Sequence, residues 1–233
     1  MSEPIFLSLK VALIAVAIVA MLATLVARVL ARRSFAGKNL LESCIILPMV
    51  LPPTVLGYGL LILLGKRGLL GRLLLDLFDW QIVFTWWAAI IAAAVVSFPL
   101  MYQSAKAAFA SVDASLEQAA RTLGSNEGRV FLRVTLPLAY PGLLAGLVLS
   151  FARALGEFGA TLMVAGNIPG KTQTIPLAIY FAVETGDNIL ARNLVLVITG
   201  LSITALFWLN LWSRKKIEVW QQGGNSSAQR IHS

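Results

Sequence analysis

Long apolar runs constrain the fold of this chain more than any other feature of its sequence. Several of them reach the roughly 20 residues that a helix needs to cross a bilayer. Of the 233 residues, 58% are hydrophobic and only 13% are charged. A soluble domain of this length would not hide so much apolar surface in its interior. The sequence therefore predicts an all-α polytopic membrane protein.

Five transmembrane helices are expected within one transmembrane domain, residues 1–213. The first apolar run, 5–30, is longer than the roughly 7–15 apolar residues of a signal peptide, so we expect it to be retained. Residues 69–82 are expected to form an amphipathic outer segment, and 174–183, too short to cross, to be re-entrant or interfacial. The predicted spans are 7–29, 41–64, 84–106, 138–163 and 193–213.

The basic residues predict the orientation of these spans, because cytoplasmic loops carry an excess of Lys and Arg. Of the 19 basic residues, twelve follow spans one, three and five, six lie on the other side, and Arg153 lies inside a span. The N-terminus is therefore expected outside and the C-terminus inside, with a disordered cytoplasmic tail at 214–233. The twelve are Arg28, Arg32, Arg33, Lys38, Lys106, Arg121, Arg129, Arg133, Arg214, Lys215, Lys216 and Arg230.

The loop between the third and fourth spans has the pattern of a short helix pair. Apolar residues recur in it at every third or fourth position. Either Asp113 or Ser115 would cap the first helix, and Gly124 would end it. Ser125 or Asn126 would cap the second. The alternative is a plain connector with an amphipathic interfacial helix.

Two adjacent prolines, Pro52 and Pro53, interrupt the second predicted span. A proline removes a backbone donor and bends a helix, and in hydrocarbon the freed carbonyls need another partner. Thr54 is a candidate donor for them. The segment is interpreted either as a broken helix that lines a pathway or as a kinked packing helix without a gate.

Arg153 and Glu157 lie one helical turn apart in the fourth predicted span. Charges at this depth are costly and usually face the bundle interior or a cavity. They form either a self-neutralised structural pair or a pathway pair that separates during gating. Ser97, Ser150 and Thr161 are further pathway candidates, unless each hydroxyl simply bonds a carbonyl of its own helix.

Gly142 and Gly146 also lie one turn apart in the fourth span, and Ser150 continues the same face. Small residues at this spacing allow two helices to approach closely in a membrane. We expect this face to contact another helix.

The sequence argues against several other functions. Residues 65–68 lack the upstream glycine and the following Ser or Thr of a phosphate-binding loop. The single histidine, His232, has no partners at metal-ligand spacing, and Cys44 is the only cysteine. We therefore expect no cofactor, no metal and no catalytic residues. The net charge of +8 is accounted for by the span ends and does not indicate nucleic-acid binding.

The loop also resembles the "EAA" loop of permease subunits in binding-protein-dependent ABC importers. Together with four other segments, it resembles the permeases of bacterial molybdate importers within the molybdate and sulfate branch. The acidic residue of the family motif falls on Gln118 here, with Glu117 one place earlier, so either of them is a candidate to face the ATPase. The resembling segments are 47–58, 97–101, 117–124, 151–161 and 167–176.

This resemblance implies a type I ABC importer permease fold in the bacterial inner membrane. It implies a homodimer surrounded by membrane lipid, two cytoplasmic ATPase subunits that hydrolyse ATP, and an extracytoplasmic oxyanion-binding protein. The substrate would be molybdate or tungstate, with sulfate or another oxyanion as the alternative. A motor-free channel or a membrane-embedded enzyme is the alternative from another class. The coupling loop, 111–137, would hold the ATPase-coupling residues Glu117, Gln118, Ala119, Ala120, Arg121, Gly124, Leu136 and Pro137.

Overall fold

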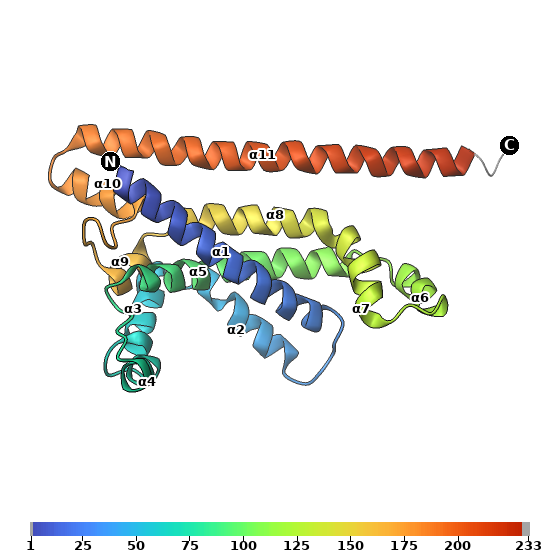
Figure 1. Cartoon of the computed structure of the whole chain (residues 1–233), viewed down its shortest axis with the longest axis horizontal. Helices are drawn as coiled ribbons and strands as arrows, with labels where there is room; N and C mark the ends of the chain where they lie inside the picture. Colours follow the sequence, from blue (N-terminus) through green and yellow to red (C-terminus); the bar gives the residue numbers. More distant parts are fainter. Residues whose placement is uncertain (1, 230–233) are drawn as a thin grey trace.

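The computed structural model describes residues 2–229, and the side chains of residues 2–208. Within that part the chain is all-helical, as predicted (Figure 1). A bundle lies at the centre, with α6 and α7 at one end and α9 and α10 at the other. The elements are α1 (Ser2–Ala31), α2 (Lys38–Val50), α3 (Pro53–Leu64), α4 (Leu69–Phe78), α5 (Trp86–Ala110), α6 (Ala114–Thr122), α7 (Glu127–Val130), the π-helix η1 (Phe131–Thr135), α8 (Leu136–Leu155), α9 (Gly159–Ala165), α10 (Ile175–Glu184) and α11 (Asn188–Gln229).

Helices α1, α5 and α8 pack against one another and form the centre of the bundle. Their contacts are dominated by small side chains, and alanines such as Ala15, Ala23 and Ala92 are fully buried. Large apolar side chains lie on the outside instead, for example Leu13 and Leu25, which are more than half exposed. This distribution suits a helix bundle in lipid, where close packing of small residues holds helices together.

The contact between α5 and α8 depends on the two glycines of the predicted small-residue face. A Cβ atom on Gly142 would lie 2.6 Å from Cβ of Ala108, and one on Gly146 would lie 2.6 Å from Cβ of Ser104. Such distances leave no room for a methyl group. The expected close helix contact at Gly142 and Gly146 is therefore confirmed, and its partner is α5.

The second predicted span is broken rather than kinked. Helix α2 ends at Val50 and α3 begins at Pro53, and the chain turns by 113° between Lys38–Val50 and Pro53–Phe78. Pro52 is the N-cap residue of α3 and Pro53 occupies its first turn, where a missing N–H costs little. Helix α3 then packs on α9 (Figure 1).

The fourth predicted span, 138–163, is divided in two. Helix α8 ends at Leu155, and α9 begins again at Gly159. The carboxylate of Glu157 accepts a hydrogen bond from the N–H of Ala160 at 2.9 Å, so it satisfies a free donor in the first turn of α9. The single helix that we expected over 138–163 was wrong at this point. The sequence shows only an apolar run with a charged residue in it, and it does not show that this carboxylate caps a new helix.

The last helix is longer than predicted. Helix α11 continues through Gln229, so residues 214–229 of the tail that we expected to be disordered are helical, and 230–233 lie outside the described residues. Residues 214–222 contain good helix formers, and extending an existing helix costs much less than nucleating a new one.

Among the residues that the structure describes, four helices are long and apolar enough to cross a membrane, and five if the bent pair α2–α3 counts as one span. Residues 69–82 and 174–183 give the short helices α4 and α10. The count of five spans and the orientation remain predictions. The ends of α1 and α5 that were predicted to be cytoplasmic do lie at the same end of the bundle as α6 and α7 (Figure 1).

The glycine contact between α5 and α8 gives a stability prediction. Gly146→Ala should lower the unfolding temperature of the purified protein in detergent, because overpacking costs about 1–3 kcal/mol. Gly200→Ala is the matched control, since a Cβ there meets nothing within 4 Å and alanine is the better helix former. Equal unfolding temperatures for the two variants would contradict close packing at Gly146.

Candidate functional site

The segment between α5 and α8 forms an exposed helix pair whose first helix, α6, has a defined start. The Asp113 carboxylate accepts a hydrogen bond from the N–H of Ser115 at 2.8 Å, so Asp113 is the cap and Ser115 is not. This bond lowers the pKa of the Asp113 carboxyl below its ordinary value. The carboxylate also lies at the end of the helix where its negative charge is favourable.

Helix α6 ends at Thr122, and Gly124 lies just past this end as the glycine that stops the helix, as predicted. Gly124 has a φ of 83°, in the left-handed region that favours glycine. The N–H of Gly124 donates to the carbonyl of Arg121 at 2.9 Å, and the N–H of Ser125 donates to that of Ala120 at 3.1 Å. These two bonds form a Schellman motif. Asn126 then caps α7 by accepting from the N–H of Arg129 at 2.9 Å.

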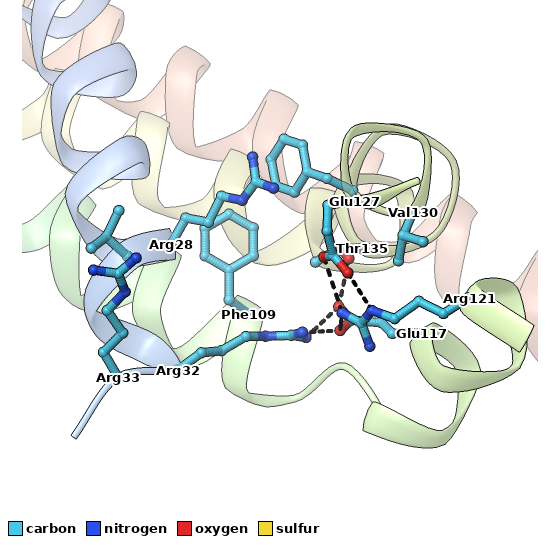
Figure 2. A pocket seen from close by; sticks show the side chains of 11 residues that line it. Arg28, Arg32, Arg33, Phe109, Glu117, Arg121, Glu127, Val130 and Thr135 are labelled. Atoms are coloured by element: carbon cyan, nitrogen blue, oxygen red, sulfur yellow. Dashed lines mark hydrogen bonds and ion pairs between the residues drawn. The ribbon is translucent and has the colours of Figure 1, made fainter. Parts of the chain in front are cut away.

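Glu117 is the centre of the site, although it belongs to the surface helix α6. Its side chain is only 1% exposed. Arg32 lies just beyond the end of α1, and the N–H groups of its two terminal guanidinium nitrogens each donate a hydrogen bond to one carboxylate oxygen of Glu117 (Figure 2). The Thr135 hydroxyl, in η1, donates to the same carboxylate at 2.5 Å. The carboxylate therefore joins α6 to the end of α1 and to the start of α8.

A second ion pair ties α6 to α7. The Nε atom of Arg121 lies 2.5 Å from a carboxylate oxygen of Glu127, and another of its nitrogens lies 3.5 Å from Glu117 (Figure 2). The bond from Arg121 lowers the pKa of the Glu127 carboxyl, and Glu127 in turn raises the pKa of Arg121. Burial, followed by the neighbouring Arg121, lowers the pKa of Arg32.

The π-helix that carries Thr135 has a local cause. Pro137 has no N–H for the carbonyl four residues earlier, and its ring needs space there. The N–H of Leu136 bonds instead to the carbonyl of Phe131, five residues back, which is the spacing of a π turn. Leu136 is half-buried and Pro137 is exposed at the start of α8.

The outer face of α6 is free of these contacts. Gln118 and Ala119 are exposed and Ala120 is half-buried. Leu123 is 86% exposed and Leu116 is 49% exposed, so the face is largely apolar. Because Glu117 points inward, Gln118 is the residue of the two that lies on the exposed face. That Gln118 faces an ATPase remains a prediction.

The proline break carries a second group of candidates. The added Cβ of Gly159 would lie 2.8 Å from Cβ of Pro53, and that of Gly57 would lie 2.8 Å from Cα of Ala160, so α3 and α9 touch closely. Thr54 is exposed, and its hydroxyl makes no hydrogen bond with the part of the chain that the structure describes. Its expected role as a donor to freed carbonyls was wrong.

The charged pair in the fourth predicted span is formed as predicted. Arg153 lies 2.7 Å from Glu157, whose side chain is 2% exposed, while that of Arg153 is 35% exposed. Glu157 bonds Arg153 with one oxygen and the N–H of Ala160 with the other. The pair therefore has a structural role at the α8–α9 break.

The three hydroxyl candidates are buried within the chain. Ser97 donates to the carbonyl of Ala93 in its own helix at 2.7 Å. Ser150 donates to the carbonyl of Ser97 at 3.3 Å and so links α8 to α5. Thr161 is 1% exposed in α9. In this conformation these side chains contribute to packing and do not line an open path.

The roles of Arg32 and Thr135 could not be predicted from the sequence. Arg32 was one of several basic residues after the first span, and 85 positions separate it from Glu117. Thr135 is a single hydroxyl between two apolar residues, Val134 and Leu136. The spacing of four between Glu117 and Arg121 was visible, but it does not show that the carboxylate is buried. Among the described residues, no group of three or more His, Cys, Asp or Glu is placed to hold a metal ion.

Comparison with known proteins supports the family resemblance. Residues 20–218 match the family described as "Binding-protein-dependent transport system inner membrane component". YvgM of Bacillus subtilis, whose name refers to a molybdenum transport system permease protein, is 51% identical over 206 residues, 88% of this chain and 91% of that protein. The molybdenum transport system permease protein ModB of Escherichia coli K12 is 46% identical over 218 residues, covering 92% and 95%.

More distant relatives include a sulfate transport system permease protein, CysW of Synechococcus elongatus, which is 38% identical over 88% of this chain and 72% of that protein. Among solved structures, a chain of the MetNI methionine ABC transporter in an inward-facing conformation matches with a TM-score of 0.70 at 16% identity, covering 92% of this chain and 95% of that one. A bacterial ABC transporter that imports alginate gives a TM-score of 0.68 at 15% identity, covering 92% and 80%. These structures show the fold.

The Glu117 cluster gives a second stability prediction. Glu117→Gln should destabilise the purified protein by about 2–3 kcal/mol, less than for a fully buried pair because Arg32 remains 42% exposed. The loss should appear as a lower unfolding temperature in detergent. Arg129→Gln, at an exposed residue of α7, is the control and should unfold like the wild type. An unchanged unfolding temperature for Glu117→Gln would remove this carboxylate as a structural centre.

Proposed function

The chain belongs to the family of binding-protein-dependent transport system inner membrane components, and from this membership we propose that it is the permease subunit of a molybdate importer. It is a transport subunit of the inner membrane and not an enzyme. Relatives named for molybdenum transport share 41–51% identity over most of the chain, against 38% for the sulfate permease. Tungstate is included in the proposed substrate class because it is a tetrahedral oxyanion like molybdate.

The observation that carries the proposal is the exposed, internally anchored helix pair α6–α7. We propose that α6 docks on an ABC ATPase through Gln118, Ala119, Ala120 and Leu123. A soluble partner would cover the exposed leucines, and small side chains at the centre permit close approach. Gly124 sets the end of this surface, while Leu136 and Pro137 begin the helix that leads back into the membrane. Arg121 and Glu127 hold the two short helices together.

In this proposal the active assembly is a homodimer with two ATPase subunits and an extracytoplasmic oxyanion-binding protein. Movement of the ATPases would displace α6, and Glu117 would pass the displacement to the bundle. Arg32 links it to α1 and Thr135 to α8. A rigid connection of this kind can shift the equilibrium between two stable packings of the helix bundle.

We place the pathway at the α2–α3 break. Pro52, Pro53 and Thr54 are exposed there, and α9 lies directly behind α3. Arg153 and Glu157 would hold the start of α9 in place, while α3 moves against α9 at their glycine contacts. Ser97, Ser150 and Thr161 would support this region from within the packed helices. Gating would then be a shear between α3 and α9.

Sulfate or another oxyanion remains the alternative substrate, supported by the sulfate permease among the relatives. Selectivity would reside mainly in the extracytoplasmic receptor, which delivers the anion to a pathway that binds it weakly. A motor-free channel or a membrane-embedded enzyme has no support from the family membership.

The docking surface is tested by co-purification with the ATPase encoded beside this chain. Leu123→Asp should reduce ATPase recovery at least tenfold, because a carboxylate would have to be buried at an apolar contact. Ala36→Asp places the same charge in the exposed α1–α2 loop and should leave recovery unchanged. If Leu123→Asp retains the ATPase as the control does, α6 is not the docking helix.

The substrate is tested in proteoliposomes that contain the permease, its ATPase and its receptor. Uptake of labelled molybdate should require ATP, and it should fall when unlabelled tungstate is present at the same concentration. An equal concentration of sulfate should leave it nearly unchanged. Sulfate uptake as fast as molybdate uptake would favour the alternative substrate, and uptake without ATP would contradict the importer.

A further inference from the structure

The Glu117 cluster opens into a cavity of about 320 Å³ that carries an excess of positive charge. Four arginines and two glutamates line it, so its net charge is +2. Glu117 and Glu127 neutralise Arg32 and Arg121. The other two arginines, Arg28 and Arg33, form no ion pair with the side chains that the structure describes. The excess charge therefore lies at the end of α1.

Arg28 is fixed in place, although none of the carboxylates that the structure describes holds it. Its guanidinium lies 3.5 Å from the ring centre of Phe131, and this ring lies 6.1 Å from that of Phe109. Stacking on an aromatic face orients a guanidinium and leaves its N–H donors free at the edge. Arg33 is exposed and extends from the end of α1 away from Glu117 (Figure 2). The guanidinium N–H groups of both Arg28 and Arg33 are therefore available to bind an anion.

The cavity adjoins the surface of α1 that is expected to face lipid. Val29, which lines the cavity, is 49% exposed, and Leu25, one turn earlier, is 54% exposed. Helix α1 is one of the helices long and apolar enough to cross the membrane, and it ends at Ala31. Arg28 and Arg33 therefore lie where the apolar helix surface ends, at the depth of the lipid headgroups.

We propose that this cavity binds the phosphate group of an anionic phospholipid, with Arg28 and Arg33 as its donors. A phosphate diester offers acceptor oxygens to both guanidinium groups, and the lipid tail continues along Val29 and Leu25. Basic pockets beside helices on the cytoplasmic side have this chemistry. The inference rests on the membrane orientation in the proposed function, and it goes beyond that function because it assigns a lipid ligand.

The test measures lipid binding to the purified full-length permease by native mass spectrometry. Short-chain phosphatidylglycerol, short-chain phosphatidylcholine and inorganic phosphate are titrated separately. Wild type should bind phosphatidylglycerol at one site per chain, and the other two much more weakly. Arg28→Gln with Arg33→Gln should weaken this binding about 30-fold, from the usual contribution of two basic residues at an anionic surface. The control, Arg129→Gln with Arg133→Gln, removes the same charge outside the cavity and should bind like wild type.

Several results would overturn the proposal. Equal weakening in both double variants would mean that only overall charge matters. Inorganic phosphate that binds as tightly as phosphatidylglycerol would point to a soluble anion. Loss of the lipid when the ATPase docks would assign the cavity to the protein interface. If the double variant does not fold, Arg33→Gln alone alters only an exposed side chain and should still weaken binding several-fold. Transport and ATPase docking are measured separately. A permease that transports without binding lipid would therefore contradict only the lipid site and not the proposed function.

Discussion

A buried carboxylate on a surface helix is the constraint on which the rest of this structure depends. Burying an ionised group is costly unless it is paired and hydrogen-bonded. Glu117 is 1% exposed, and it can remain ionised only because Arg32 and Thr135 reach it from two other elements. Satisfying this one group fixes three parts of the chain relative to one another: the end of α1, the helix α6 and the π turn before α8. The exposed apolar face of α6 is thereby presented on a rigid base.

The membrane environment explains how the bundle itself is held together. Lipid offers no hydrophobic drive between helices, so association depends on close packing and internal hydrogen bonds. The alanine-rich contacts of α1 and the glycines Gly142 and Gly146 provide that packing. The two helix breaks occur at Pro52 and at Glu157. Pro53 in the first turn of α3 has no N–H that needs a partner, and the Glu157 carboxylate accepts a hydrogen bond from the first turn of α9. A shear at these breaks would leave the central packing intact.

Local sequence signals predicted local structure well. Asp113, Gly124 and Asn126 act as a cap, a helix end and a second cap, since each depends on backbone geometry within a few residues. Contacts between distant segments could not be predicted in this way. The Arg32–Glu117 pair spans 85 positions, and the burial of Ser97 depends on which face of α5 meets α8. A capping role for Glu157 was concealed because its spacing from Arg153 explained the charge without it.

The most direct test of this account asks whether α6 and the end of α1 move as one body during transport. Spin labels on Ser34→Cys and Ser115→Cys within one protomer, with Cys44→Ala, would report their separation by electron paramagnetic resonance. The assembled transporter would be measured without nucleotide and with ATP bound. One unchanged distance is expected in both states, because Glu117 and Arg32 stay joined. A distance that changes on ATP binding would show that the link opens, and would contradict Glu117 as the connection between the ATPase and the bundle.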